Sequence, residues 1–217
     1  MMDVKINYDK LLQNELAQIE KSGSKPSLLL HACCAPCSTY VLEYLSNHFD
    51  ITVYFYNPNI YPKDEYDFRA DELSRFVADC YKNENMKVVC ENYNDAEFYG
   101  AISGLEEEGE GSARCKRCYE LRLDRAGQYA AENRFDYFTT TLSISPYKNC
   151  KWLNEIGGKC AEKYNIKYLF SDFKKNNGYK RSCEISRKYG LYRQDYCGCV
   201  YSKRESERRN RGAEKSN

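Results

Sequence analysis

Short apolar runs alternate with longer stretches of helical periodicity along most of the chain. The runs at residues 27–31, 51–56, 88–90, 135–140 and 168–170 are each bounded by polar or turn residues, which predicts buried strands. Helices are predicted between them, over residues 38–47, 64–83, 115–133, 147–164 and 179–189. Strands that alternate with helices indicate an α/β protein with a parallel sheet of about five strands flanked by helices.

The two ends and the middle of the chain have a different character. Leu12, Leu16 and Ile19 recur at helical spacing, which predicts an amphipathic helix that ends near Gly23. Residues 94–105 are expected to form a short helix or loop, and the acidic, glycine-containing stretch 106–112 a loop. We therefore predict an N-terminal helical extension over 1–24, a single α/β catalytic domain over 25–202 and a charged C-terminal tail over 203–217.

Composition adds one anomaly, which is cysteine. The chain has 217 residues with 33 basic and 32 acidic side chains, so its net charge of +1 gives no general attraction to nucleic acid. No apolar run approaches the roughly 20 residues of a membrane helix, and the N-terminus lacks an apolar signal region. We therefore expect a cytoplasmic protein with no membrane contact. In a reducing compartment, 12 partly clustered cysteines indicate metal binding or redox chemistry rather than structural disulfides.

The first cluster, His31-Ala-Cys33-Cys34-Ala-Pro36-Cys37, follows the first predicted strand directly. Ligands of parallel α/β sheets bind at the carboxyl ends of the strands, and the dipole of a following helix stabilises thiolates. Pro36 helps to fix the turn between strand and helix. Small buried cysteines in a tight turn are the alternative, which three cysteines in five positions make the weaker one.

Two further cysteine pairs lie far along the chain. Cys115 and Cys118 form a C-x-x-C pair at a helix start, which suits zinc, an iron–sulfur cluster or a redox disulfide. Cys197 and Cys199 flank Gly198, and a disulfide across so small a ring would be strained and easily reduced. Two thiolates on one metal are the other interpretation of that pair. The alternative for Cys115 and Cys118 is a basic helix start with two incidental cysteines. The alternative for Cys197 and Cys199 is two buried cysteines around a packing glycine.

Counting the sulfurs favours chemistry over a purely structural site. Four thiolates complete a zinc or iron–sulfur site, and Cys33, Cys34, Cys115 and Cys118 would fill one. Cys37, Cys197 and Cys199 then remain beside it as spare sulfurs. The isolated cysteines are expected to have no function: Cys80, Cys90, Cys150, Cys160 and Cys183.

Four motifs between Leu28 and Ser202 carry a resemblance to a known family: HACCAPC, GEGSARCKRCYELRL, TTLSISPYKN and SDFKKNNGYKRSCEISRKYGLYRQDYCGC. Together they resemble the cobalamin-independent epoxyqueuosine reductase family, QueH. The resemblance implies a Rossmann-like (HUP-like) fold and an oxidoreductase that removes the epoxide oxygen of epoxyqueuosine, at the wobble position of tRNA, to give queuosine. It also implies a 4Fe-4S cluster with an adjacent second iron.

The same resemblance assigns roles to the cysteines. Cluster ligands are implied at Cys33, Cys34, Cys115 and Cys118. Cys197 and Cys199 are implied as a redox-active pair or as ligands of the second iron, with Cys37 at that metal too. We take Cys37, Cys197 and Cys199 as the catalytic cysteines and all seven as metal-binding. The family pattern also tolerates aspartate at the position of Cys37.

The implied partners are a tRNA anticodon loop and an external electron donor, with no stable protein partner. Unstacked RNA bases bind aromatic side chains, so candidate contacts are tyrosines near the strand ends: Tyr54, Tyr56, Tyr61, Tyr147, Tyr192 and Tyr196. Candidate phosphate contacts are the basic clusters Arg114/Lys116/Arg117, Lys148/Lys151, Lys174/Lys175 and Lys180/Arg181. Candidate proton donors are His31, Asp195 and Tyr196, although a histidine at a strand end is more often a satisfied core residue.

Three other kinds of protein deserve comparison. A zinc-binding RNA-binding module without catalysis would share the cysteines and the basic clusters. A metal-free thiol–disulfide oxidoreductase would use the C-x-x-C and C-x-C pairs alone. An ATPase that modifies tRNA would need a glycine- or serine-rich phosphate loop after the first strand, where this chain has His-Ala-Cys-Cys-Ala-Pro-Cys.

Overall fold

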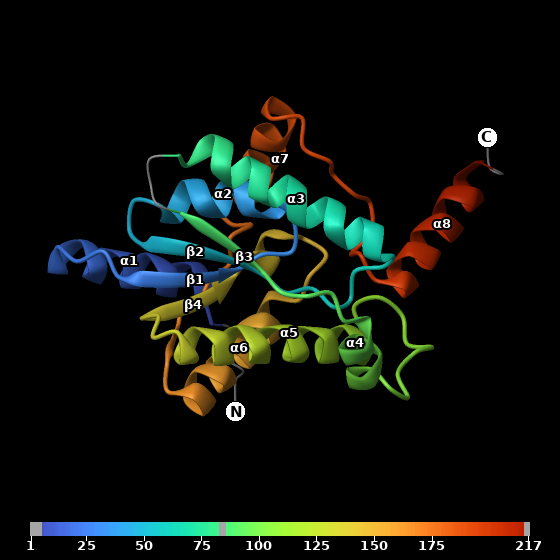
Figure 1. The fold of residues 1–217 in the computed structure, drawn as a ribbon, viewed down its shortest axis with the longest axis horizontal. Helices are drawn as coiled ribbons and strands as arrows, with labels where there is room; N and C mark the ends of the chain where they lie inside the picture. The colour runs from blue at the N-terminus through green and yellow to red at the C-terminus, as the bar shows by residue number, and fades with distance from the viewer. Residues whose placement is uncertain (1–5, 83–85, 215–217) are drawn as a thin grey trace.

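Five parallel strands form one sheet at the centre of the molecule (Figure 1). The computed structural model describes residues 6–82 and 86–214. The sheet has the order β3-β2-β1-β4-β5, and its strands are β1 (Ser27–His31), β2 (Asp50–Phe55), β3 (Lys87–Cys90), β4 (Tyr137–Thr140) and β5 (Lys167–Tyr168). All four neighbouring pairs are parallel. The predicted Rossmann-like α/β architecture with about five strands is confirmed.

Helices cover both faces of this sheet. They are α1 (Tyr8–Ser22), α2 (Ala35–Leu45), α3 (Lys63–Cys80), α4 (Asp95–Ala101), α5 (Ala113–Glu132), α6 (Cys150–Tyr164), α7 (Gly178–Lys188) and α8 (Val200–Glu214), with a short 3-10 helix η1 (Thr141–Ile144) after β4. Figure 1 shows α2, α3 and α7 over one face and α5 and α6 over the other, while α8 projects from one end.

The central strand β1 separates two hydrophobic clusters. Leu28 and Leu30 belong to the cluster beneath α2 and α3, whereas Leu29 faces the cluster beneath α5 and α6. All three leucines are fully buried, which is the pattern of a strand covered on both faces. Helix α1 also joins the core, because its buried Leu12 and Leu16 belong to the first cluster.

Local capping explains where element boundaries differ from the predicted ones. Helix α2 begins at Ala35 rather than at 38, because Pro36 is tolerated in a first turn that needs no intrahelical N–H. Helix α6 begins at Cys150 rather than at 147, because the Asn149 side chain accepts a hydrogen bond from Trp152 N and caps the helix there.

The charged C-terminal stretch forms α8, a helix that the apolar pattern does not predict. Predictions for residues 1–5, 83 and 215–217 lie outside the described residues. The domain boundaries at residues 24 and 202 stay predictions.

The strand order creates a switch point at the carboxyl ends of β1 and β4. From β1 the chain passes to β2 on one side, and from β4 it passes to β5 on the other. Helices therefore leave β1 and β4 toward opposite faces, and the carboxyl ends of these two strands form the place at which such folds bind ligands. Cys33 and Cys34 follow β1, and Thr141 follows β4, at this switch point.

Candidate metal centre

The turn after β1 gathers three sulfurs. The Sγ atoms of Cys33, Cys34 and Cys37 all lie within 4.8 Å of one another, and those of Cys33 and Cys34 are 3.7 Å apart. Cys34 is the N-cap of α2 in extended conformation, and Cys37 lies in its first turn, so the start of the helix aims both at Cys33. The predicted cysteine cluster at the carboxyl end of the first strand is confirmed, and it could bind a metal ion.

Helix α5 supplies the second pair, Cys115 and Cys118. Both lie near its N-terminus, and the Gly111 N–H donates a hydrogen bond to Cys115 Sγ over 3.3 Å. Gly111 adopts φ 84°, a left-handed conformation that glycine takes without strain. The acidic loop thus closes back on the helix start and directs an N–H group at the sulfur.

The C-x-C pair is held by the first turn of α8. Cys197 N donates to Ser202 Oγ over 2.7 Å, and Ser202 N donates to Cys199 Sγ over 3.4 Å. Gly198 has φ 116°, and a Cβ there would lie 3.0 Å from the Arg69 guanidinium. The backbone conformation therefore favours glycine between the two cysteines, and a side chain there would also press on Arg69.

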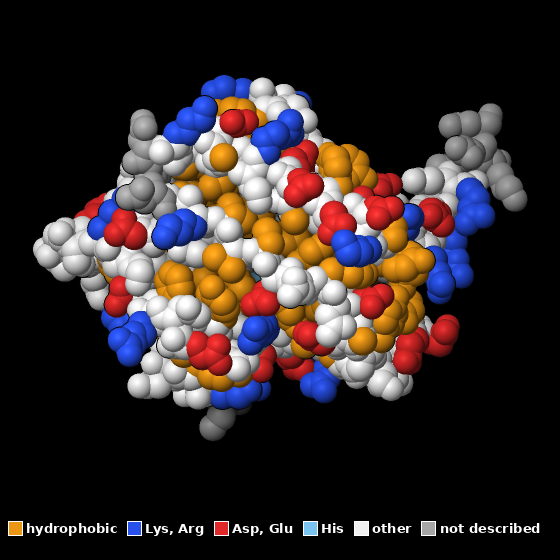
Figure 2. Space-filling view, viewed as in Figure 1, with side chains coloured by type: hydrophobic (Ala, Val, Ile, Leu, Met, Phe, Trp, Pro, Cys, Tyr) orange, Lys and Arg blue, Asp and Glu red, His pale blue; other side chains and the backbone are white. Residues whose placement is uncertain are grey.

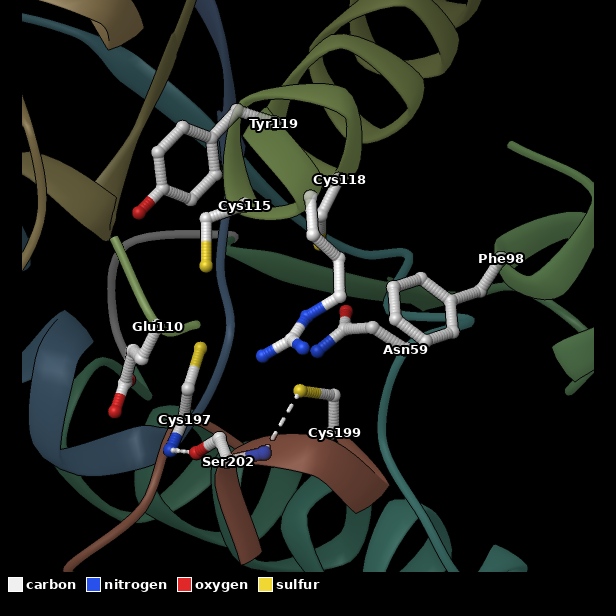
Figure 3. Close-up of a pocket in the computed structure, with 10 residues that line it drawn as sticks. Asn59, Phe98, Glu110, Cys115, Cys118, Tyr119, Cys197, Cys199 and Ser202 are labelled. Atoms are coloured by element: carbon white, nitrogen blue, oxygen red, sulfur yellow. Dashed lines mark hydrogen bonds between the residues drawn. The ribbon is translucent and has the colours of Figure 1, made fainter. Parts of the chain in front are cut away.

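These two pairs line one pocket. Figure 3 shows the sulfurs of Cys115, Cys197 and Cys199 pointing into the space between α5 and the start of α8. The pocket is also lined by Cys118, Asn59, Phe98, Glu110, Arg114, Tyr119 and Ser202. Asn59 is 2% exposed, and its Oδ1 has no hydrogen-bond partner among the described residues. An aromatic ring, an amide and several thiols thus converge on one small space.

Two cations connect this pocket to the sulfurs after β1. Burial opposes the charge of Arg122, but negative charge on the sulfurs of Cys118, Cys33 and Cys197, as thiolates, raises its pKa above the ordinary value. Lys148 donates from Nζ to Cys197 Sγ over 2.9 Å, and negative charge on Cys197 and Cys33 likewise raises its pKa against the effect of burial. Arg122 and Lys148 therefore each interact electrostatically with Cys33 after β1 and with a cysteine of the pocket.

A third buried cation, Arg69 of α3, lies beside the C-x-C loop. Its side chain is 1% exposed, pairs with Glu65 at 2.7 Å and lies 5.3 Å from the centre of the Tyr196 ring. Burial opposes its charge, but negative charge on Cys34 and then on Glu65 raises its pKa above the ordinary value. Arg69 therefore interacts electrostatically with Cys34 in the turn after β1, and its guanidinium lies next to Gly198 in the C-x-C loop.

The donor set fits a soft, thiophilic metal group. Burial raises the pKa of Cys118 to about 11 and that of Cys199 to about 12, so both are protonated at neutral pH unless a metal displaces the proton. Arg122 is 1% exposed, and its Nε has no hydrogen-bond partner among the described residues. A buried guanidinium facing thiols requires negative charge there, which thiolates on a metal would supply.

The candidate proton donors His31 and Asp195 are not in their acid forms at neutral pH. His31 is fully buried, its Nδ1 and Nε2 contact Thr140 Oγ1 and Tyr56 O, and burial lowers its pKa to about 3. It is a neutral core histidine. Asp195 accepts a hydrogen bond from Ser206 Oγ over 2.8 Å, which lowers its pKa and keeps it a carboxylate.

Several predicted RNA contacts are wrong, because the side chains are used inside the protein. Tyr54 and Tyr56 are buried and donate to Glu91 and Glu97. Arg114 is 3% exposed, pairs with Glu205 at 3.1 Å and stacks on Tyr201, and Lys148 lies among the thiols. The exposed tyrosines of the predicted set are Tyr61, Tyr147 and Tyr192. Its exposed basic side chains are Arg117, Lys151, Lys175, Lys180 and Arg181.

Arg69, Asn59 and Arg122 are site residues that the cysteine pattern does not predict. Arg122 had a usable signal, because it lies four residues after Cys118 and therefore on the same helix face. Asn59 sits in the Asn-Pro-Asn turn after β2, again at a strand end. Arg69 is at mid-helix in a charged segment, where nothing distinguishes it from a solvated arginine.

The fold and the site together define the class: a parallel α/β protein with a cysteine-rich redox or metal site at its switch point. A family model described as "Epoxyqueuosine reductase QueH" matches residues 28–205. The chain belongs to this family, and it is an oxidoreductase.

Curated relatives agree over most of the chain. A Streptococcus pyogenes protein named epoxyqueuosine reductase QueH is 49% identical over 200 residues, which cover 91% of this chain and 78% of that protein. Proteins of the same name from Staphylococcus epidermidis and Thermotoga maritima are 46% and 37% identical, over 93% and 87% of this chain and 87% and 95% of their own. No helix in residues 6–82 and 86–214 is long and apolar enough to cross a membrane.

Proposed function

We propose that the protein reduces epoxyqueuosine to queuosine at the wobble position of tRNA, with iron bound by its cysteines. The observation that supports the proposal is that the sulfurs of residues 33–37 and the pocket lined by Cys115, Cys118, Cys197 and Cys199 share two cationic neighbours, Arg122 and Lys148. The names of the relatives support the substrate. Because that substrate is tRNA, we expect the protein in the cytoplasm.

The sulfurs divide into two sets in this proposal. Cys33, Cys34, Cys115 and Cys118 would hold a 4Fe-4S cluster, and Cys37, Cys197 and Cys199 would hold a second iron beside it. Such a cluster supplies electrons singly, and an iron with an open position polarises a bound oxygen. Arg69, Arg122 and Lys148 would balance the negative charge that four or more buried thiolates bring.

The chemistry requires two electrons and two protons. They convert the epoxide into an alkene and release its oxygen as water. In the alternative state, without the second iron, Cys197 and Cys199 as free thiols would carry both pairs, because closing a disulfide between them releases two electrons and two protons. An external donor would then reduce the disulfide again. Lys148 holds a further proton at Nζ, in hydrogen-bond contact with Cys197 Sγ.

The pocket also offers groups for holding a nucleobase. Phe98 and Tyr119 provide aromatic faces, and unstacked RNA bases are bound by stacking and edge hydrogen bonds. The unpartnered Asn59 Oδ1 would accept a hydrogen bond from the substrate, which would satisfy an otherwise costly buried acceptor. Asn59 is a positioning residue in this proposal.

Anaerobic purification with iron, sulfide and zinc quantified tests the cofactor, and turnover of tRNA that carries epoxyqueuosine tests the reaction. We expect about four or more irons with matching sulfide, broad visible absorption and conversion to queuosine that needs a reductant. One zinc with no iron and no turnover would instead identify the RNA-binding module. Turnover that survives chelation would identify a metal-free dithiol enzyme.

A further inference from the structure

Helix α8 is an unusual element, because it projects from the body and has almost no apolar face (Figure 1). Among its described side chains only Ser202 and Ser206 are buried. Residues 203–211 contain five basic and two acidic side chains. A polar helix of 15 residues with such internal repulsion has little stability of its own, so an anionic partner would stabilise it.

Glu205, in the second turn of α8, points toward the body of the protein, whereas several arginines of the helix are exposed to solvent. Glu205 pairs with Arg114 at 3.1 Å and also accepts a hydrogen bond from Glu110 N. Exposed Arg204, Arg208 and Arg211 follow one another at helical spacings of four and three residues, which puts them on one face over about 10 Å.

Exposed aromatic rings lie where this arginine face meets the cysteine pocket. Tyr61 is 41% and Tyr99 is 37% exposed, and Tyr61 N donates to Gly198 O in the C-x-C loop over 2.9 Å. Burial raises the pKa of Tyr99, and the nearby charge of Arg204 opposes that rise. Figure 2 shows hydrophobic side chains gathered between α3, α4 and the foot of α8, with basic side chains along α8.

We propose that the outer face of α8, together with Tyr61 and Tyr99, is the docking surface for the tRNA anticodon stem-loop. In this arrangement Arg204, Arg208 and Arg211 bind phosphates of the stem, and the two tyrosines stack on loop bases beside the pocket. The inference rests on the proposed function for its partner. It assigns that partner to a segment of which residues 206–214 lie outside the matched family region.

Binding of an unmodified tRNA transcript to the full chain tests the arginine face. The triple variant Arg204→Gln, Arg208→Gln, Arg211→Gln should bind about 10- to 100-fold more weakly at low salt. Its log K against log salt should be flatter by about 2 to 3, because each lost phosphate contact removes just under one unit of slope.

A matched control removes three positive charges near the amino ends of the strands, at the end of the sheet opposite the cysteines. Lys21, Lys25 and Lys87 are exposed and lie near the amino ends of β1 and β3. Their triple substitution to Gln should leave the affinity and the salt slope within about twofold of wild type. Equal binding by wild type and the α8 variant would overturn the proposal, as would an equal loss in the control.

The tyrosines have a separate test with an isolated anticodon stem-loop RNA. Tyr99→Ala should weaken binding roughly tenfold, whereas Tyr99→Phe should bind as wild type does, because stacking needs the ring and not the hydroxyl. Equal loss on a stem RNA that lacks the loop would exclude stacking on loop bases. Failure of the proposed reaction appears differently: tRNA would still bind through α8 while epoxyqueuosine remained unreduced.

Discussion

Arg122 shows how one residue connects packing to chemistry. It is 1% exposed, it donates to Asn57 Oδ1, and it forms no carboxylate ion pair within residues 6–82 and 86–214. A permanently charged guanidinium in such a place is costly to bury unless negative charge faces it. The thiols of Cys118, Cys33 and Cys197 are the groups that face it.

Substitution of Arg122 by Met should therefore affect the metal-free and the metal-loaded protein in opposite directions. Metal-free protein should be as stable as wild type or more stable by about 1–3 kcal/mol, because an uncompensated buried charge is removed. Metal-loaded protein should lose iron faster. Urea unfolding of the metal-free form and iron release to a chelator measure the two effects. A strongly destabilised metal-free variant that keeps its iron would mean that Arg122 only supports Asn57.

The ligand assignment can be tested with two cysteines of equal burial. Cys118 is 7% exposed on α5 and Cys160 is 6% exposed on α6. We expect Cys118→Ala to lower the iron and sulfide content to less than half, and Cys160→Ala to leave both unchanged, measured on anaerobically purified protein. Normal iron content in Cys118→Ala would remove this cysteine from the ligand set.

At the scale of elements, α6 packs closely on β5 through a glycine. A Cβ at Gly157 would lie 2.2–2.5 Å from ring carbons of Tyr168, whereas one at neighbouring Gly158 would lie 3.4 Å from Phe170. Gly157→Ala should reduce the free energy of unfolding by about 1–3 kcal/mol through overpacking. Gly158→Ala should be neutral or slightly stabilising, since alanine favours helix. Urea unfolding of both variants decides, and equal stability would mean that Tyr168 moves freely.

A carboxylate joins the starts of β1 and β4. Asp136 accepts hydrogen bonds from Ser27 N and Ser27 Oγ at 2.8 and 2.7 Å, and these bonds lower its pKa. The resulting stabilisation is present above the unfolded-state pKa of about 4 and is lost as pH falls through the lower folded-state pKa.

Asp136→Asn should therefore destabilise metal-free protein at pH 7, and the difference from wild type should shrink in acid. Urea midpoints across pH 3–7 measure it. In a Ser27→Ala background, where the Oγ donor is missing, the same substitution should have a smaller effect. A difference that is constant with pH would contradict the role given to the carboxylate.

The boundaries of helices and strands were predictable where burial or capping produces a recognisable pattern of residues in the local sequence. Strand β1 matches its prediction because three consecutive leucines are buried on both faces. Strand β4 starts two residues late, because Phe135 N bonds to Ala130 O and still belongs to the end of α5. Helix α8 had no apolar periodicity to detect, and its contacts with the body join residues far apart in the sequence, such as Glu205 with Arg114 and Tyr201 with Phe98.

Within the site, the cysteines were predictable and their surroundings were not. Sulfurs that follow a strand or open a helix can be placed at the sheet edge from topology alone. The buried roles of Arg114 and Lys148 depend on long-range partners, Glu205 and Cys197, so sequence alone assigned both to phosphate contacts. A basic side chain next to a motif cannot be separated from a solvated one without knowledge of which helix face is covered.

At the scale of the whole molecule, the proposed site would join segments 33–37, 115–118 and 197–199. A metal group held by all three would bind only the native arrangement and would stabilise it. Removal by a chelator without oxygen should lower the melting temperature and speed proteolysis between residues 190 and 199, which lie outside helices and strands. Melting curves and mass analysis of fragments test this. Identical cleavage with and without metal would exclude the last segment from the site.

Ser202 has a mechanical consequence. It bonds to Cys197 N and to Cys199 Sγ while it is itself part of the first turn of α8. The C-x-C loop and the first turn of α8 are therefore joined at one serine, so a displacement of the helix would be passed to the segment that carries both sulfurs. If tRNA docks on α8 as proposed, its binding would be coupled through Ser202 to the positions of Cys197 and Cys199.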